Sequence, residues 1–83
     1  MILAKGTAGI ASVSLASAPE KARYMVDRVA GPEQEQRRLS EMGFVEGARL
    51  QVLTRTREGM MVVKLGGSRL ALARGMADYV FVK

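Results

Sequence analysis

The stretch Gln36–Leu50 reads Gln-Arg-Arg-Leu-Ser-Glu-Met-Gly-Phe-Val-Glu-Gly-Ala-Arg-Leu, and it decides the fold that we expect. Leu39 and Met42 are three residues apart, so a helix would place them on one face. Gly43 can adopt the left-handed conformation that ends a helix. Phe44 can then fold back onto the helical pair. The stretch therefore predicts a short helix that is stopped by a glycine and anchored by an aromatic side chain.

The neighbouring residues define where this helix begins and where the next strand starts. Pro32 suits a first helical turn, because its missing N–H would have no partner there in any case. Glu33 and Glu35 place negative charge near the positive end of the helix dipole. Gly47 permits a second sharp turn, so we expect a strand to begin near Ala48.

Five segments alternate between apolar and polar residues, as strands with one buried face do. They are residues 21–29, 48–57, 60–65, 69–73 and 79–82. Glu58-Gly59 and Gly66-Gly67 are signals for hairpin turns, and Arg74–Asp78 suits a single 3₁₀ turn before the last strand. Short strands joined by tight turns predict a mainly β fold, namely a small bent five-stranded barrel with one helix after its first strand.

The alternation assigns side chains to the two faces of the sheet. The expected inner positions are Leu50, Val52, Thr54, Thr56, Met61, Val63, Leu65, Leu70, Leu72, Val80 and Val82. Leu15 is the expected first core residue. The outer face would then carry a basic stripe made of Arg49, Arg55, Arg57, Lys64 and Arg69.

Composition limits the chemistry that the chain can perform. The 83 residues suit one domain, and they include neither cysteine nor histidine. Nucleophilic triads, thiolate metal sites and disulfides are therefore excluded. The eight acidic residues are scattered singly, so we expect no catalytic carboxylate pair. The formal net charge of +5 permits contact with nucleic acid, phosphates or an acidic protein face without choosing among them.

The N-terminal residues 1–13 are rich in Ala, Gly, Ser and Thr. We expect them to form a loose leader with a short extended piece at Met1–Leu3, and residues 14–83 to form the domain. Ala16-Ser17-Ala18 resembles a signal-peptide cleavage site, although the preceding apolar run is broken by glycine and polar residues.

The motif Arg-Leu-x-x-Met-Gly-Phe-x-x-Gly, at residues 38–47, resembles the signature of the FeoA family of small cytoplasmic proteins of bacterial ferrous iron uptake. Residues 69–74 and 77–82 resemble that family's closing segments, and the similarity runs from Ser14 to the C-terminus. The resemblance implies an SH3-like barrel. The matching residues are Leu39, Met42, Gly43, Phe44, Gly47, Leu70, Leu72 and Val80.

The resemblance also implies a function: a non-enzymatic accessory protein that contacts the cytoplasmic G domain of a FeoB-type membrane transporter. Fe(II) would be the cargo of the pathway. We expect no tight iron site and no cofactor, because thioether sulfur is a soft ligand and Met60 and Met61 face opposite sides of a strand. We place the partner surface around the Glu58-Gly59 hairpin, at Arg55, Arg57, Glu58, Met60 and Val62.

Two alternatives stay open. The basic stripe could bind nucleic acid, although the chain has only four aromatic residues for stacking. Exposed Val62 and Phe81 could instead mediate weak self-association. The same barrel resembles the C-terminal domain of iron-dependent transcriptional repressors, and the chain departs from the FeoA pattern at Glu46, where family members often have proline.

Overall fold

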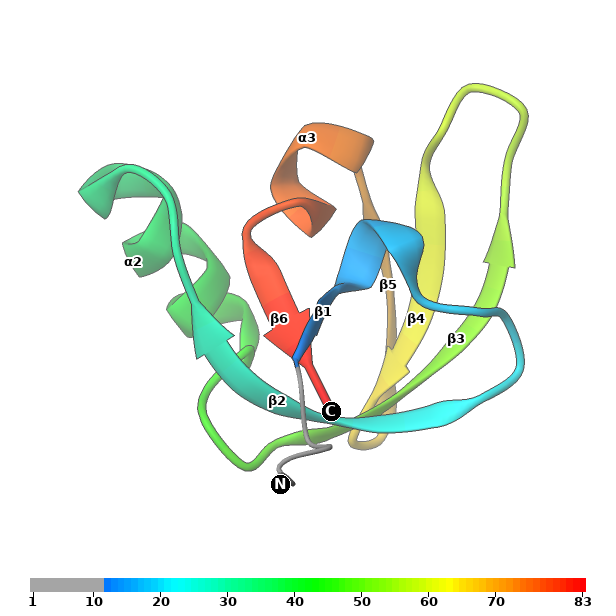
Figure 1. Cartoon of the computed structure of the whole chain (residues 1–83), viewed down its shortest axis with the longest axis horizontal. Coiled ribbons are helices and arrows are strands. Elements are labelled where there is room, and N and C mark those ends of the chain that lie inside the picture. The colour runs from blue at the N-terminus through cyan, green and yellow to red at the C-terminus, as the bar shows by residue number, and fades with distance from the viewer. Residues whose placement is uncertain (1–11) are drawn as a thin grey trace, which may run out of the picture.

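Six antiparallel strands form one sheet in the computed structural model, which describes residues 12–83 (Figure 1). Along the sheet the strand order is β1-β6-β2-β3-β4-β5. The elements are β1 Val13–Ser14, the 3₁₀ helix η2 Leu15–Ser17, β2 Arg23–Val29, α2 Glu33–Met42, β3 Arg49–Arg55, β4 Met61–Leu65, β5 Ser68–Leu72, α3 Arg74–Ala77 and β6 Val80–Val82. The predicted extended piece Met1–Leu3 lies outside the described residues.

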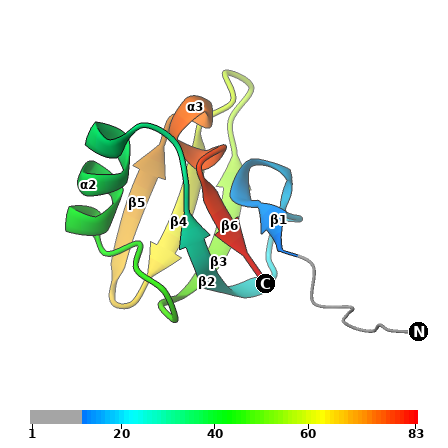
Figure 2. The same cartoon turned by 60° about the vertical axis from the view of Figure 1, so that its left-hand side comes forward.

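The strand β2 joins the two halves of the sheet. Its residues Arg23–Met25 pair with β3, whereas Val26–Val29 pair with β6. The register shifts between Val26 and Arg28, and such a bulge bends a strand. The sheet therefore curves round on itself (Figure 2), with α2 and η2 on opposite sides of the molecule.

The prediction of a mainly β fold with one helix after the strand expected at residues 21–29 is confirmed, with three differences in detail. A sixth strand, β1, pairs with β6 through Val13 and Val82. The turn expected as 3₁₀ before the last strand is one turn of α-helix, α3, in which the amide of Asp78 donates to the carbonyl of Arg74. The strand expected from Lys21 begins at Arg23, because Lys21 has a φ of 64°, which no extended strand allows.

The end of α2 matches the prediction closely. Gly43 has a φ of 109°, its amide donates to the carbonyl of Ser40, and the amide of Phe44 donates to that of Leu39. This pair of bonds is the Schellman motif, which satisfies carbonyls that a helix end would otherwise leave free. Leu39 and Phe44 are both buried in the core, and Met42 packs against it.

Gly47 forms the second sharp turn. The amide of Ala48 donates to the carbonyl of Val45 at 2.9 Å, and Gly47 has a φ of 87° at the third position. These are the features of a type II turn. The following strand begins at Arg49, one residue later than expected.

The hairpin β4–β5 also agrees with the sequence. Gly66 and Gly67 form a two-residue turn that places Leu65 opposite Ser68. The inner residues Met61, Val63, Leu65 and Leu72 are buried, as are Val80 and Val82 of the last strand. Leu15, expected as the first core residue, is completely buried.

The strand β3 departs from the regular alternation expected for residues 48–57. Val52 pairs with Val63, but Thr54 pairs with Val62, so one extra residue is accommodated between them. This bulge reverses the faces beyond Val52: Thr54 is exposed, and Arg55 lies opposite the buried Met61. The expected inner positions of Thr54 and Thr56 and the expected outer position of Arg55 were therefore wrong.

Candidate functional site

The β3–β4 hairpin projects beyond the body of the sheet (Figure 1). Its loop is fixed by Thr56, whose amide donates to the carbonyl of Met60 at 2.8 Å and whose hydroxyl accepts from the Met60 amide at 3.1 Å. Gly59, with a φ of 91°, donates to the carbonyl of Thr56. The tip is thus a bonded turn that presents its side chains in a defined direction.

The predicted partner residues do not all lie together at this tip. Arg57 and Glu58 are exposed in the loop, and Met60 is 39% exposed beside them. Val62 is half-buried on β4. We define the hairpin tip as Arg57, Glu58 and Met60, since these three predicted residues share one exposed surface.

Arg55 points away from the tip, towards the N-terminal segment. Its Nη2 donates to the carbonyl oxygen of Ala18 and, at 3.1 Å, to that of Ala16. The amide of Arg55 also donates to the Glu20 carboxylate at 2.7 Å. The guanidinium of Arg55 therefore donates its hydrogen bonds within the fold, and charged donors of this kind make strong hydrogen bonds. We assign Arg55 a structural role, which is to fasten η2 to the barrel.

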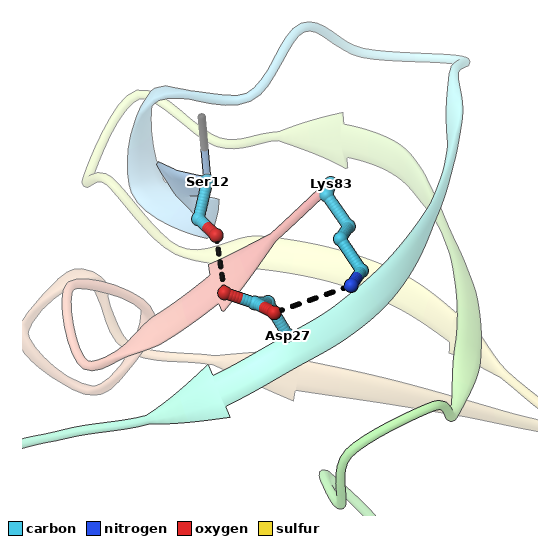
Figure 3. A network of polar contacts seen from close by, with 3 residues as sticks. All are labelled: Ser12, Asp27 and Lys83. Carbon is cyan, nitrogen blue, oxygen red and sulfur yellow. Dashed lines mark hydrogen bonds and ion pairs between the residues drawn. The ribbon is translucent and has the colours of Figure 1, made fainter. Parts of the chain in front are cut away.

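A second polar contact fastens the same segment (Figure 3). The Ser12 hydroxyl donates to one carboxylate oxygen of Asp27, and Lys83 lies 3.4 Å from the other. The pKa of Asp27 is lowered, chiefly because the Ser12 hydroxyl donates a hydrogen bond to the charged carboxylate. Partial loss of solvent around the carboxylate raises the pKa, and the ammonium group of Lys83 lowers it further. The two contacts hold η2 so that Leu15 and Ala18 remain in the core.

The outer face of the sheet carries a row of cations at the end opposite the hairpin tip. Arg23 pairs with Gln51, Gln51 with Lys64, and Lys64 with Arg69, so the four residues cross β2, β3, β4 and β5 in register. Arg49 lies two residues before Gln51 on the same face of β3. We call Arg23, Arg49, Lys64 and Arg69 the basic face; all four are exposed.

The basic face differs from the stripe expected from the sequence. Arg55 leaves it because of the bulge in β3, and Arg57 lies in the loop. Arg23 joins it, which sequence reasoning missed. The alternation of residues 21–29 does place Arg23 on the outer face, so the signal was present, but the pairing of β2 with β3 was needed to use it.

Two shallow hollows lie near this face. One, of about 280 Å³, is lined by Arg23, Arg49, Gln51 and Lys64 together with Leu50 and Gly66. The other, of about 430 Å³, lies between the end of α2 and the β4–β5 hairpin and is lined largely by apolar side chains. Arg49 and Gly66 line both.

Residues 12–83 hold no group of three or more acidic side chains that could bind a metal ion. Met61 is buried whereas Met60 is exposed, so the two adjacent sulfurs do not converge. The prediction that the chain has no tight iron site stays a prediction. Within the same residues, no helix is long and apolar enough to cross a membrane.

A family model described as the FeoA domain matches residues 13–83 of this sequence. The chain belongs to the FeoA family. A search of curated proteins finds no match. The motif at residues 38–47, which suggested the family, therefore identified it correctly.

Solved structures agree with this assignment. The iron uptake regulatory protein FeoA, known from a crystal structure, has 29% sequence identity to this FeoA-family chain and a TM-score of 0.80. The match covers 88% of this chain and 97% of that protein. FeoA of Stenotrophomonas maltophilia in complex with zinc, described as a prokaryotic SH3 domain protein, is 28% identical with a TM-score of 0.74, over 86% and 89% of the two chains. The expected SH3-like fold is confirmed.

The same fold occurs in a larger protein of another kind. A manganese-dependent transcriptional repressor in complex with manganese has a TM-score of 0.81 over 87% of this FeoA-family chain, but only 36% of the repressor is covered. At 24% identity this likeness shows the fold alone.

The motif residues of this FeoA-family protein build its barrel. Six of them belong to the core or pack against it, and the two glycines form the turns described above. They are Leu39, Met42, Gly43, Phe44, Gly47, Leu70, Leu72 and Val80. The motif therefore accounts for the architecture, and the residues that contact a partner must be sought among the exposed side chains.

Proposed function

We propose that this protein is a non-enzymatic, cytoplasmic accessory protein of ferrous iron transport, which acts by binding the cytoplasmic G domain of a FeoB-type membrane transporter. The observation that carries the proposal is the match of the FeoA domain over residues 13–83. The relative from S. maltophilia has itself been put forward as a bacterial ferrous iron transport activating factor. Fe(II) is then the cargo of the transporter, and this chain regulates its passage.

The hairpin tip is the surface that we assign to this contact. Met60 offers an exposed apolar side chain, and the exposed charged residues Arg57 and Glu58 lie in the same loop. An apolar centre with a charged rim is the usual anatomy of a protein interface. Because the loop is held by the bonds of Thr56, binding would require little ordering of the tip.

The proposal assigns no chemical step to the chain. General acid–base and nucleophilic catalysis usually depend on histidine, cysteine or paired carboxylates, and the sequence has neither of the first two. The acidic residues of the described part of the chain do not gather in a cluster. Regulation through contact needs none of these groups.

The test is binding of the isolated G domain of a FeoB-type transporter to the full chain, measured by isothermal titration calorimetry. We expect Met60→Asp and Arg57→Glu each to weaken binding about tenfold or more, as truncation of interface centres commonly does. Val45→Asp is the matched control, since Val45 is an exposed apolar residue away from the tip. A folded wild-type chain that fails to bind at high micromolar concentration, or a control that weakens binding equally, would refute the proposal.

A further inference from the structure

The cations of the basic face form no ion pair with acids of the same strands: the one acid on these strands, Asp27 of β2, pairs with Lys83 instead. The three strands β3, β4 and β5 contain Arg49, Lys64 and Arg69 but no aspartate or glutamate. Within residues 12–83 the only ion pair is the one between Lys83 and Asp27. The positive potential over this face is therefore uncompensated by the protein itself.

One pair within the basic face is unfavourable for the fold. Lys64 and Arg69 lie directly opposite each other on β4 and β5, and like charges in this position destabilise a sheet. An exposed row of this kind contributes nothing to the core. Its arrangement is accounted for if the opposite charge is supplied by another molecule.

From this geometry we propose that the basic face binds an extended acidic segment of a protein partner. Measured across the sheet, the first and fourth of four neighbouring strands lie about 14 Å apart, because adjacent strands are about 4.8 Å apart. Side chains on one face of an extended segment recur about every 6.8 Å, so three acidic residues at alternate positions span about the same length. Arg23, Lys64 and Arg69 lie along this row.

The arginines suit carboxylates in particular. A guanidinium presents a planar fork of donors that matches a carboxylate with two parallel hydrogen bonds. Three of the four cations of the basic face are arginines. The hollow bounded by Arg23, Arg49 and Lys64 gives an acidic side chain a place with cations on more than one side.

A polypeptide fits this face better than single-stranded nucleic acid does. Proteins that bind single strands combine cations with aromatic side chains on which bases stack. The four aromatic residues are occupied elsewhere: Phe44 is buried, Tyr24 donates to the carbonyl of Pro19, Tyr79 packs against Gly31, and Phe81 lies 4.0 Å beneath the guanidinium of Arg28.

An anionic membrane fits less well for a different reason. Stable attachment to a bilayer surface needs apolar side chains that insert, in addition to a few cations. The exposed large apolar residues of the described chain are Val13, Val45 and Met60, and none belongs to the basic face. The chemistry of this face thus matches carboxylates on a polypeptide.

This inference does not depend on the proposed function. The hairpin tip lies beyond the end of β3, whereas Arg49 begins that strand and Lys64 lies next to the end of β4, so the two surfaces are at opposite ends of one hairpin. A variant of one surface leaves the other intact. Failure of acidic-segment binding can therefore be separated from failure of G-domain binding.

The test uses the full ¹⁵N-labelled chain and a short acetylated peptide in which glutamate alternates with threonine. We expect amide shifts concentrated on β2 to β5 around the basic face, and none with a peptide that has glutamine in place of glutamate. Arg49→Glu/Lys64→Glu should weaken binding about tenfold, as expected for the loss of two exposed ion pairs. Arg37→Glu/Arg38→Glu, the same charge change on exposed positions of α2, should leave binding within about twofold.

Four results would overturn the proposal. Shifts spread evenly over the molecule, or an equal loss in both double variants, would mean that the peptide responds only to net charge. Tighter binding of an oligothymidylate at the same amides would assign the face to nucleic acid. Tighter binding of phosphatidylserine vesicles than of the peptide, lost in Arg49→Glu/Lys64→Glu, would assign it to a membrane surface.

Discussion

Replacing Arg55 by alanine removes the guanidinium that fastens η2 to the barrel. The Nη2 group has two N–H donors, and its nearest acceptors are the carbonyls of Ala18 and Ala16. Both acceptors belong to the segment that places Leu15 and Ala18 in the core. We therefore expect the variant to be less stable, because the carbonyls lose their donor and the segment is held less firmly.

The size of the effect can be worked from these two bonds. A hydrogen bond to a charged group contributes about 1.5–3 kcal/mol, and the site is only partly buried, so water replaces part of the lost interaction. We expect Arg55→Ala to lower the free energy of unfolding by about 2–3 kcal/mol. For a domain of this size that corresponds to a fall in Tm of about 10–20 °C.

Urea unfolding followed by far-UV circular dichroism measures this difference. Arg57→Ala is the matched control, since Arg57 is exposed in the loop two residues later; its change should stay within about 0.5 kcal/mol. Arg55→Lys should fall between the two, because an ammonium lacks the planar fork. The contrary outcome is that Arg55→Ala lowers the free energy of unfolding no more than Arg57→Ala does, while the variant no longer binds the G domain. That result would refute the structural assignment and make Arg55 a partner-binding residue.

Three further predictions concern single positions. Lys64→Glu should raise the free energy of unfolding by about 0.2–1 kcal/mol, because it turns the repulsion with Arg69 into attraction; chemical denaturation checks this. Glu46→Pro should stabilise the chain by about 0.4–1 kcal/mol, since proline suits the second position of the type II turn before Gly47; no change or a loss in Tm would contradict it. Asp27 has a lowered pKa in the folded state, so its contribution to stability is present above its ordinary pKa of 3.8 and is lost as the pH falls through the lowered value. Unfolding midpoints measured from neutral to acidic pH should therefore fall more for the wild type than for Asp27→Asn.

The features that could be predicted from the sequence are those that local residues determine. The Schellman motif depends only on Gly43, Phe44 and the carbonyls of the helical turn just before them. The β4–β5 hairpin turn consists of Gly66 and Gly67 alone. Alternation on β4 holds because its register with β5 is regular from Met61 to Leu65. In each case the physical cause lies within a few residues of its effect.

The features that were missed depend on distant parts of the chain. Nothing in Val52-Leu53-Thr54 distinguishes a bulged strand from a regular one, and the shift becomes visible only in its pairing with β4. β1 has two residues and exists because β6 lies beside it. The first of these features also affects the predicted site: Arg55 was expected on the outer face because the faces of β3 were read as unbroken, whereas its part in partner binding stays a prediction.

The net charge does not show which cations can bind a partner, because contacts between distant parts of the chain engage some of them. Some of its cations are used by the fold: Arg55 binds backbone carbonyls, Lys83 pairs with Asp27, and Arg28 lies over Phe81. A binding surface has to come from the cations that remain, and in the described residues those of the basic face form no ion pair with the chain's own acids. Charge reversal should therefore separate the two groups: at Arg55 it should unfold the chain, whereas at Lys64 it should leave the barrel intact and weaken its binding of carboxylates.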